Sequence, residues 1–172
     1  MPNHSPSALD LAGRIIDHKD GTTALHQAAE EGTLKDISGV TAELLATLKD
    51  NDGWTPLHDA AFYGHLDQIP GVTAEFLANV KDNHDETPLD HAAHYGHLDQ
   101  ILGVTTKLLA TVKDYYGRTA LDHAAEHGHL DQIPGVTVAF LANVKSVYGH
   151  TPLHIAVRMC FQTLFIIYFY AT

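Results

Sequence analysis

Histidine is the residue type in this 172-residue chain that is best suited to chemistry, and it occurs 14 times. An imidazole binds transition metals and titrates near neutral pH. His91, His94 and His97 form the densest group, but on a helix His97 would lie about 240° around the axis from His91. Zinc needs ligands that converge at about 2 Å. This spacing predicts no metal site and no cofactor, with a His-rich metal-binding protein as the less favoured alternative.

Nucleophilic catalysis has little support in the sequence. The four serines lie outside any nucleophile-elbow motif, and no glycine-rich phosphate loop is present. Asp90-His91 and Asp122-His123 are recurring Asp-His pairs, but adjacent residues on a helix point about 100° apart. A catalytic dyad is needed once, whereas a structural pair recurs. We therefore expect no enzymatic activity.

Charge and cysteine content limit the partners and the compartment. The formal net charge is −11 and the Lys and Arg residues are scattered singly, which argues against nucleic-acid binding. Protonation of every histidine would bring the charge to +3, so we hypothesise that partner binding depends on pH. Cys160 is the single cysteine and residues 1–5 show no secretory signal. We expect a cytoplasmic location, with export lacking such a signal as an alternative.

A fixed period shows which elements position these residues. The same phrase starts at a threonine every 32 residues, at Thr23, Thr55, Thr87, Thr119 and Thr151. Such a period is typical of a stacked solenoid. In the second unit, Thr55 and Pro56 are helix-start residues and Gly64 is a helix-end residue. The sequence predicts a short first helix over about residues 56–63.

The second half of each unit is less regular. The apolar rhythm of residues 66–77 is interrupted by Pro70 and Gly71. Either Asp67 caps one helix that has Pro70 in its first turn, or a short turn ends at Gly71 and Thr73 caps a second helix. We favour the turn followed by a helix.

The phrase D-x-x-G-x-T-P-L-H-x-A-A-x-x-G-H, from Asp50 to His65, resembles the ankyrin repeat. The resemblance covers about residues 17–157. It departs from the family in its 32-residue period, in the Pro70-Gly71 step, and at Asp90 and Asp122, which replace the family's histidine. The resemblance implies an all-α solenoid of helix-turn-helix units with projecting turns. The units are predicted at about 17–48, 49–80, 81–112 and 113–144, with a partial unit at 145–157.

The two ends differ from these units. Residues 1–16 are predicted as a lead and a capping helix, started by a Ser7/Asp10 capping box. The apolar face of this helix is predicted to contain Leu9, Ala12, Ile15 and Ile16. Residues 158–172 form an atypical hydrophobic segment, and its apolar run is too short for the ~20 residues of a transmembrane span. The segment is a helix packed on the fourth unit, a surface for a partner or for self-association through residues 159–172, or a truncated or altered end.

The resemblance also implies where function is located. In ankyrin proteins the turn tips and the exposed ends of the first helices line a concave face that binds a protein partner. We expect a non-enzymatic protein-binding module with an unidentified partner, aromatic anchors and surrounding acids that favour a basic or polar surface. The predicted partner-binding residues are Asn51, Asp52, Trp54, Phe62, Tyr63, His84, Glu86, His94, Tyr95, Tyr115, Tyr116, Arg118, Glu126, His127, Tyr148 and His150.

Overall fold

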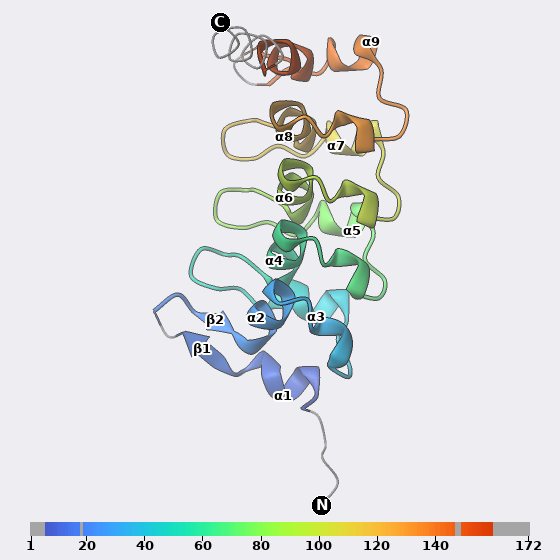
Figure 1. Ribbon diagram of the computed structural model, residues 1–172. Helices are drawn as coiled ribbons and strands as arrows, with labels where there is room; N and C mark the ends of the chain where they lie inside the picture. The colour runs from blue at the N-terminus through green and yellow to red at the C-terminus, as the bar shows by residue number, and fades with distance from the viewer. Residues whose placement is uncertain (1–5, 18, 147–148, 160–172) are drawn as a thin grey trace, which may run out of the picture.

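The computed structural model describes residues 6–17, 19–146 and 149–159, which form a stack of similar layers (Figure 1). Each layer has a long first helix, a 3-10 turn and a short second helix. First helices are stacked in one column, second helices in a column beside it, and the turns project to one side (Figure 1). This arrangement is the predicted helical solenoid.

The elements follow this order along the chain. The first helices are α2 (Ala24–Glu30), α4 (Pro56–Tyr63), α6 (Pro88–Tyr95) and α8 (Ala120–His127). The 3-10 turns are η1 (Leu34–Asp36), η2 (Leu66–Gln68), η3 (Leu98–Gln100) and η4 (Leu130–Gln132). The second helices are α3 (Ala42–Thr47), α5 (Ala74–Leu77), α7 (Thr106–Leu109) and α9 (Val138–Leu141). Residues 152–159 are also helical.

A buried threonine starts each first helix. Thr55 has an extended backbone, and its N–H donates to Nδ1 of His58 at 3.1 Å. In the next unit Asp90 takes the histidine's place, and its Oδ2 accepts from the N–H and Oγ1 of Thr87 at 2.8 and 2.7 Å. Both versions satisfy N–H groups that a helix start leaves without an intrahelical partner.

The step at Pro70 and Gly71 separates two elements, as favoured from the sequence. The 3-10 turn η2 ends before it, and Gly71 has a φ of +78°. Thr73 then caps α5, with its Oγ1 accepting the N–H of Phe76 at 3.2 Å. A left-handed residue at this point lets the chain reverse into the second helix.

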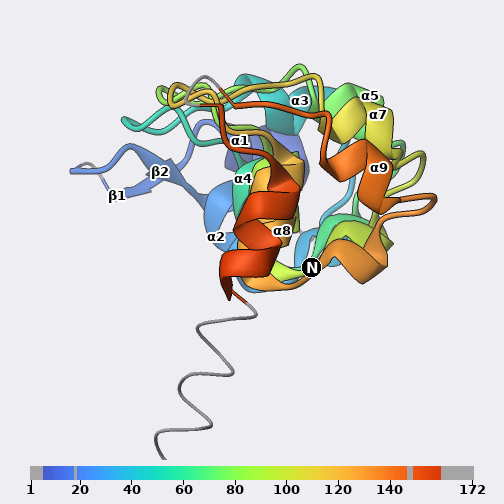
Figure 2. The same cartoon turned by 90° about the horizontal axis from the view of Figure 1, so that it is seen from above.

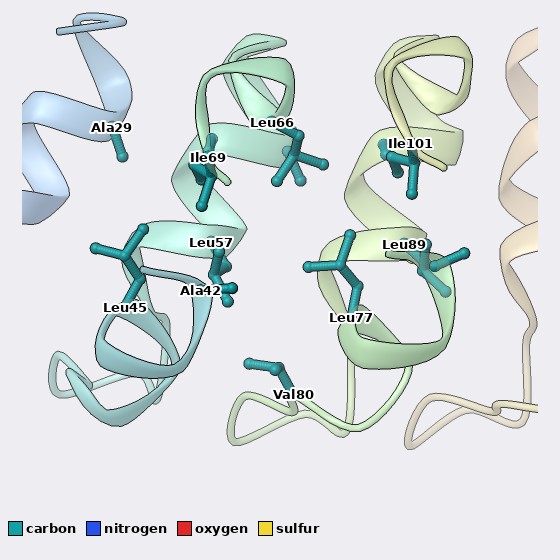
Figure 3. Packing of buried hydrophobic residues seen from close by; sticks show 14 of the residues in the cluster. Ala29, Ala42, Leu45, Leu57, Leu66, Ile69, Leu77, Val80, Leu89 and Ile101 are labelled. Atoms are coloured by element: carbon teal, nitrogen blue, oxygen red, sulfur yellow. The ribbon is translucent and has the colours of Figure 1, made fainter. Parts of the chain in front are cut away.

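The core is a continuous strip between the layers rather than a single centre. Leu57 and Leu89 are at most 1% exposed (Figure 3), and alanines such as Ala60 and Ala92 in the same helices are fully buried. Small side chains let neighbouring first helices approach closely. Full burial of a leucine contributes about 1.5–3 kcal/mol, so each layer stabilises the next.

The N-terminal part differs from the prediction. Ser7 and Asp10 do form the capping box of α1 (Ala8–Ala12), but the helix ends there and the predicted apolar face is wrong. Ile15 lies in β1 (Ile15–Asp17), which pairs antiparallel with β2 (Thr22–Thr23). Leu9 is 76% exposed, whereas Ala8 and Leu11 are buried against the stack. Within the residues that the structure describes, the regular secondary structure is therefore helical apart from one small two-stranded sheet.

The predicted hydrophobic C-terminal segment falls mostly outside the described residues. Nearly all of the segment at 158–172, with its possible role in self-association, lies beyond residue 159. Within the described ranges, no helix has the length and apolarity needed to cross a bilayer.

Candidate functional site: the face of turns and first helices

The face formed by the projecting turns and the first helices has two hollows. In the view along the stack, the turns lie to one side of the column of first helices, and the second helices form a column beside it (Figure 2). The larger hollow has a volume of about 580 Å³ and is lined by Tyr116, Arg118, Asp122, Glu126, Ser146, His150, His154, Ile155 and Arg158. The smaller has a volume of about 230 Å³ and is lined by Trp54, Phe62, Glu86, Asp90, His91, His94, Tyr95, Arg118 and His123. Most predicted partner-binding residues of the first helices therefore border one of these hollows.

Rings from successive units contact one another along this face. The centroid of Phe62 lies 4.1 Å from that of Tyr95, and the ring of Trp54 lies 4.5 Å from that of His91. The rings of His94 and His127 are 3.6 Å apart. These rings thus pack between neighbouring units, and all of them except that of His127 also line the smaller hollow.

Tyr115 and Tyr116 are the most exposed aromatic residues on the face. They are 74% and 50% exposed, and their rings meet edge to face at 5.4 Å. The Arg118 guanidinium lies 5.7 Å from the centroid of Tyr116. An exposed aromatic pair beside a guanidinium offers a large contact area at small entropic cost.

Arg118 joins carboxylates from two neighbouring units. Its Nε lies 3.0 Å from Oδ2 of Asp114, and its Nη atoms lie 3.5 Å from Glu86 and 3.9 Å from Glu126. Burial works against ionisation of Asp114, but the His123 imidazole 3.6 Å away and hydrogen bonds from Arg118 hold the pKa of that carboxyl below its usual value. The guanidinium is thereby fixed between the two hollows.

The turn tips have a structural role as well as an exposed surface. The side-chain amide of Asn51 donates to the carbonyl of Lys19 at 2.7 Å, and that of Asn83 donates to the carbonyl of Asn51 at 3.0 Å. The amide of Asn51 is thus engaged between turns, while Asp52 and His84 are exposed at the tips. These bonds fix the distance between successive turns.

The remaining predicted partner-binding residues lie at the ends of first helices, beside the larger hollow or outside the described residues. Tyr63 is 44% exposed at the end of α4, and His127 is exposed at the end of α8. His150 is exposed beside the larger hollow. Tyr148 lies outside the described residues.

Burial changes the expected titration of the histidines. Desolvation lowers the pKa of His58 to about 4, that of His91 to about 3 and that of His94 to about 4. Burial therefore opposes protonation of these three histidines in weak acid, because a charged imidazole loses its solvation inside the folded layers. The dependence of partner binding on pH stays a prediction.

The sequence argument missed a buried polar cluster below the smaller hollow. From the sequence, histidines were considered as metal ligands only in combination with other histidines, whereas in the structure they lie beside carboxylates. Ligand atoms of Asp82, Glu86 and His91 all lie within 4.8 Å of one another, as do those of Glu86, Asp114 and His123. The sequence does contain a signal for this cluster. The turn aspartate and the histidine that follows the helix-capping Asp are separated by the same number of residues in two units, from Asp82 to His91 and from Asp114 to His123.

Comparison with known families agrees with this geometry. A family model described as ankyrin repeats, in three copies, matches residues 6–70. Residues 6–70 thus match the ankyrin-repeat family, and the match itself does not extend to five copies. No curated protein matches the chain. Ankyrin repeats are generally protein–protein interaction modules and are typically non-enzymatic.

Proposed function

We propose that this chain binds a protein partner on the face of turns and first helices, with the larger hollow at its centre. The observation that carries the proposal is the exposed Tyr115–Tyr116 pair beside Arg118 at the edge of a hollow of about 580 Å³. Aromatic residues and arginine contribute most of the binding energy in protein interfaces. The proposed role is binding rather than catalysis.

The charges around the hollow indicate the chemistry of the partner. Asp122 and Glu126 line it together with Arg118 and Arg158, but the chain as a whole has a formal net charge of −11. Long-range attraction will therefore favour a basic or polar partner surface. We also propose a cytoplasmic location, because one cysteine allows no intrachain disulfide.

Rigidity supports this role. The turns are joined by backbone bonds such as Asn83 N–H to Asp52 carbonyl at 3.1 Å and Tyr115 N–H to His84 carbonyl at 2.8 Å. A surface that is ordered before binding loses less conformational entropy when the partner arrives. The exposed aromatic residues are thus held ready on a stiff frame.

Site-specific photo-crosslinking in cells tests the location of the interface. A photoreactive phenylalanine analogue at Tyr116 should capture a discrete protein, whereas the same analogue at Leu102 should not. Leu102 is 74% exposed and follows η3, on the side of the second helices. Capture at Leu102 and not at Tyr116 would place the interface on the other side of the stack.

A further inference from the structure

The turn aspartate of the third unit has one engaged and one free carboxylate oxygen. Oδ1 of Asp82 accepts the N–H groups of His84 and Glu86 at 2.7 and 2.9 Å. Oδ2 is buried and has no hydrogen-bond partner among the described residues. The Nε2 atom of His91 is in the same condition, in a residue that is 8% exposed. A buried polar atom without a partner has lost its hydration and gained no hydrogen bond in return.

The fourth unit shows how the same fold satisfies the equivalent aspartate. Oδ1 of Asp114 accepts the N–H of Arg118 at 2.8 Å, and Oδ2 accepts from Nε of Arg118 at 3.0 Å. That Oδ2 also lies 3.6 Å from Nε2 of His123. A cationic side chain therefore neutralises the turn aspartate in this layer.

The third unit has the opposite charge at the corresponding position. Glu86 stands directly before Thr87, where Arg118 stands directly before Thr119. Instead of a guanidinium, Asp82 thus has a second carboxylate and the imidazole of His91 nearby, and one ligand atom from each of the three residues lies within 4.8 Å of the other two. Arg118 reaches Glu86 only at 3.5 Å and from the next layer. The third layer lacks the cation that the fourth layer has.

We propose that Asp82, Glu86 and His91 bind one divalent transition-metal ion of the Zn²⁺ class. One imidazole and two carboxylates are an accepted ligand set for zinc, with metal–ligand distances of about 2.0–2.2 Å. Tetrahedral ligands at that distance lie about 3.4 Å apart, so side-chain movements of about 1 Å bring the three atoms together. The hollow lined by Glu86 and His91 provides space for a fourth ligand.

The ligand types decide between classes of cation. Magnesium and calcium prefer six or more oxygen ligands, whereas the neutral imidazole of His91 favours zinc, cobalt and related ions. Glu86, Asp114 and His123 do not form a second site of this kind, because Oδ2 of Asp114 already accepts a hydrogen bond from Nε of Arg118. The proposal is therefore for one ion per chain.

The chain itself supplies suitable test variants. His91→Gln introduces the residue that the first unit has at the same position, Gln27. Asp82→Asn keeps an Oδ1 acceptor for the turn but replaces Oδ2 with an NH₂ group, which cannot bind a metal. His84→Gln is the matched control, because His84 is exposed at the neighbouring turn tip.

Zn²⁺ affinity is measured by competition with a chromophoric chelator, and Co²⁺ substitution reports the coordination by its visible absorption. We expect one Zn²⁺ per wild-type chain, a tetrahedral Co²⁺ spectrum and unchanged affinity in His84→Gln. In His91→Gln and Asp82→Asn the affinity should fall by about 100-fold or more, since loss of even an outer partner costs 10–100-fold. Circular dichroism verifies folding. Wild-type affinity in both variants, or no saturable 1:1 site in the wild type, would overturn the proposal.

Discussion

At the residue scale, glycine and histidine act together across the layers. Gly64 ends α4 with a φ of +79°, and a Cβ there would lie 2.9 Å from the ring of His97. In the preceding layer, Nδ1 of His65 donates to the carbonyl of Ala29 at 2.9 Å and its ring lies over Gly32 in the same way. In these layers, the glycine that ends the first helix of one unit thus contacts the histidine that follows the equivalent glycine in the next unit.

The first prediction separates backbone strain from this contact. Gly64→Ala should lower the free energy of unfolding by about 2–4 kcal/mol, of which ~1–2 kcal/mol comes from the left-handed backbone and the rest from displacement of His97. Gly71→Ala is the control, because its φ is +78° but no heavy atom lies within 4 Å of the added Cβ. Urea denaturation gives both values. Equal losses would show that the His97 contact contributes nothing.

The second prediction concerns Asp59. Burial, and then the charges of Asp50 and Glu30, raise the pKa of Asp59 to about 8. The unfolded carboxyl ionises near pH 4, so between pH 4 and 8 the folded state holds the extra proton. The contribution of this residue to stability therefore falls as pH rises through that range.

Asp59→Asn should remove this dependence. Relative to wild type, the variant should gain stability from pH 5 to 7.5, by up to about 1.4 kcal/mol per pH unit. Urea denaturation at several pH values measures the difference between the two proteins, which cancels the titration of all other groups. A difference that does not change with pH would contradict the raised pKa.

At the element scale, the start of each first helix also links the units. In the second unit His58 caps α4 through Nδ1, and its Nε2 lies 3.3 Å from the carbonyl of Glu86 in the next turn. Asp90 retains the cap in the third unit but leaves its Oδ1 buried without a hydrogen-bond partner among the described residues. His58 therefore both caps its helix and links it to the next layer, whereas Asp90 only caps its helix.

His58→Asp tests this division of roles. Because Asp90 shows that aspartate caps the helix, the variant should keep α4 and lose the bond to Glu86 together with the ring contacts of His58. We expect the free energy of unfolding to fall by about 1–3 kcal/mol, as for a broken buried hydrogen bond. Denaturation with unchanged helical circular dichroism of the folded state verifies it. Full wild-type stability would mean that the link between units has no energetic weight.

At the scale of the whole molecule, stacking of similar layers leaves one face for binding. Each first helix packs on the first helices of adjacent units, so stability is close to a sum over units and their interfaces. Side chains at the turn tips and exposed helix ends contribute less to this sum. They are therefore the positions at which binding residues can vary.

The features that could be predicted from the sequence are those determined within one unit. The period, the helix from Pro56 to Tyr63 and the left-handed Gly64 follow from local residue types. Asp85 stands where the other turns have glycine, and its φ of +60° keeps the left-handed turn geometry that aspartate tolerates better than most residues. Local chemistry sufficed because it recurs with the same neighbours in each layer.

The features that were missed depend on contacts between distant positions. Ile15 was assigned to a helix by its spacing, but Gly13 ends α1 and the chain then pairs with Thr23 as a strand. The free oxygen of Asp82 and the ring of His91 come together only when the turn folds over α6. The spacing of apolar residues along one helix predicts neither the strand pairing of Ile15 nor the approach of Asp82 to His91.

The central claim is that the partner binds on the face of turns and first helices, and the affinity of the crosslinked partner tests it most directly. Isothermal titration calorimetry should show Tyr116→Ala binding about 10-fold or more weakly than wild type, since truncation of an aromatic hot spot costs more than ~1.4 kcal/mol. Leu102→Ala should bind as wild type does. Equal dissociation constants for wild type and Tyr116→Ala, with a loss in Leu102→Ala, would contradict the account.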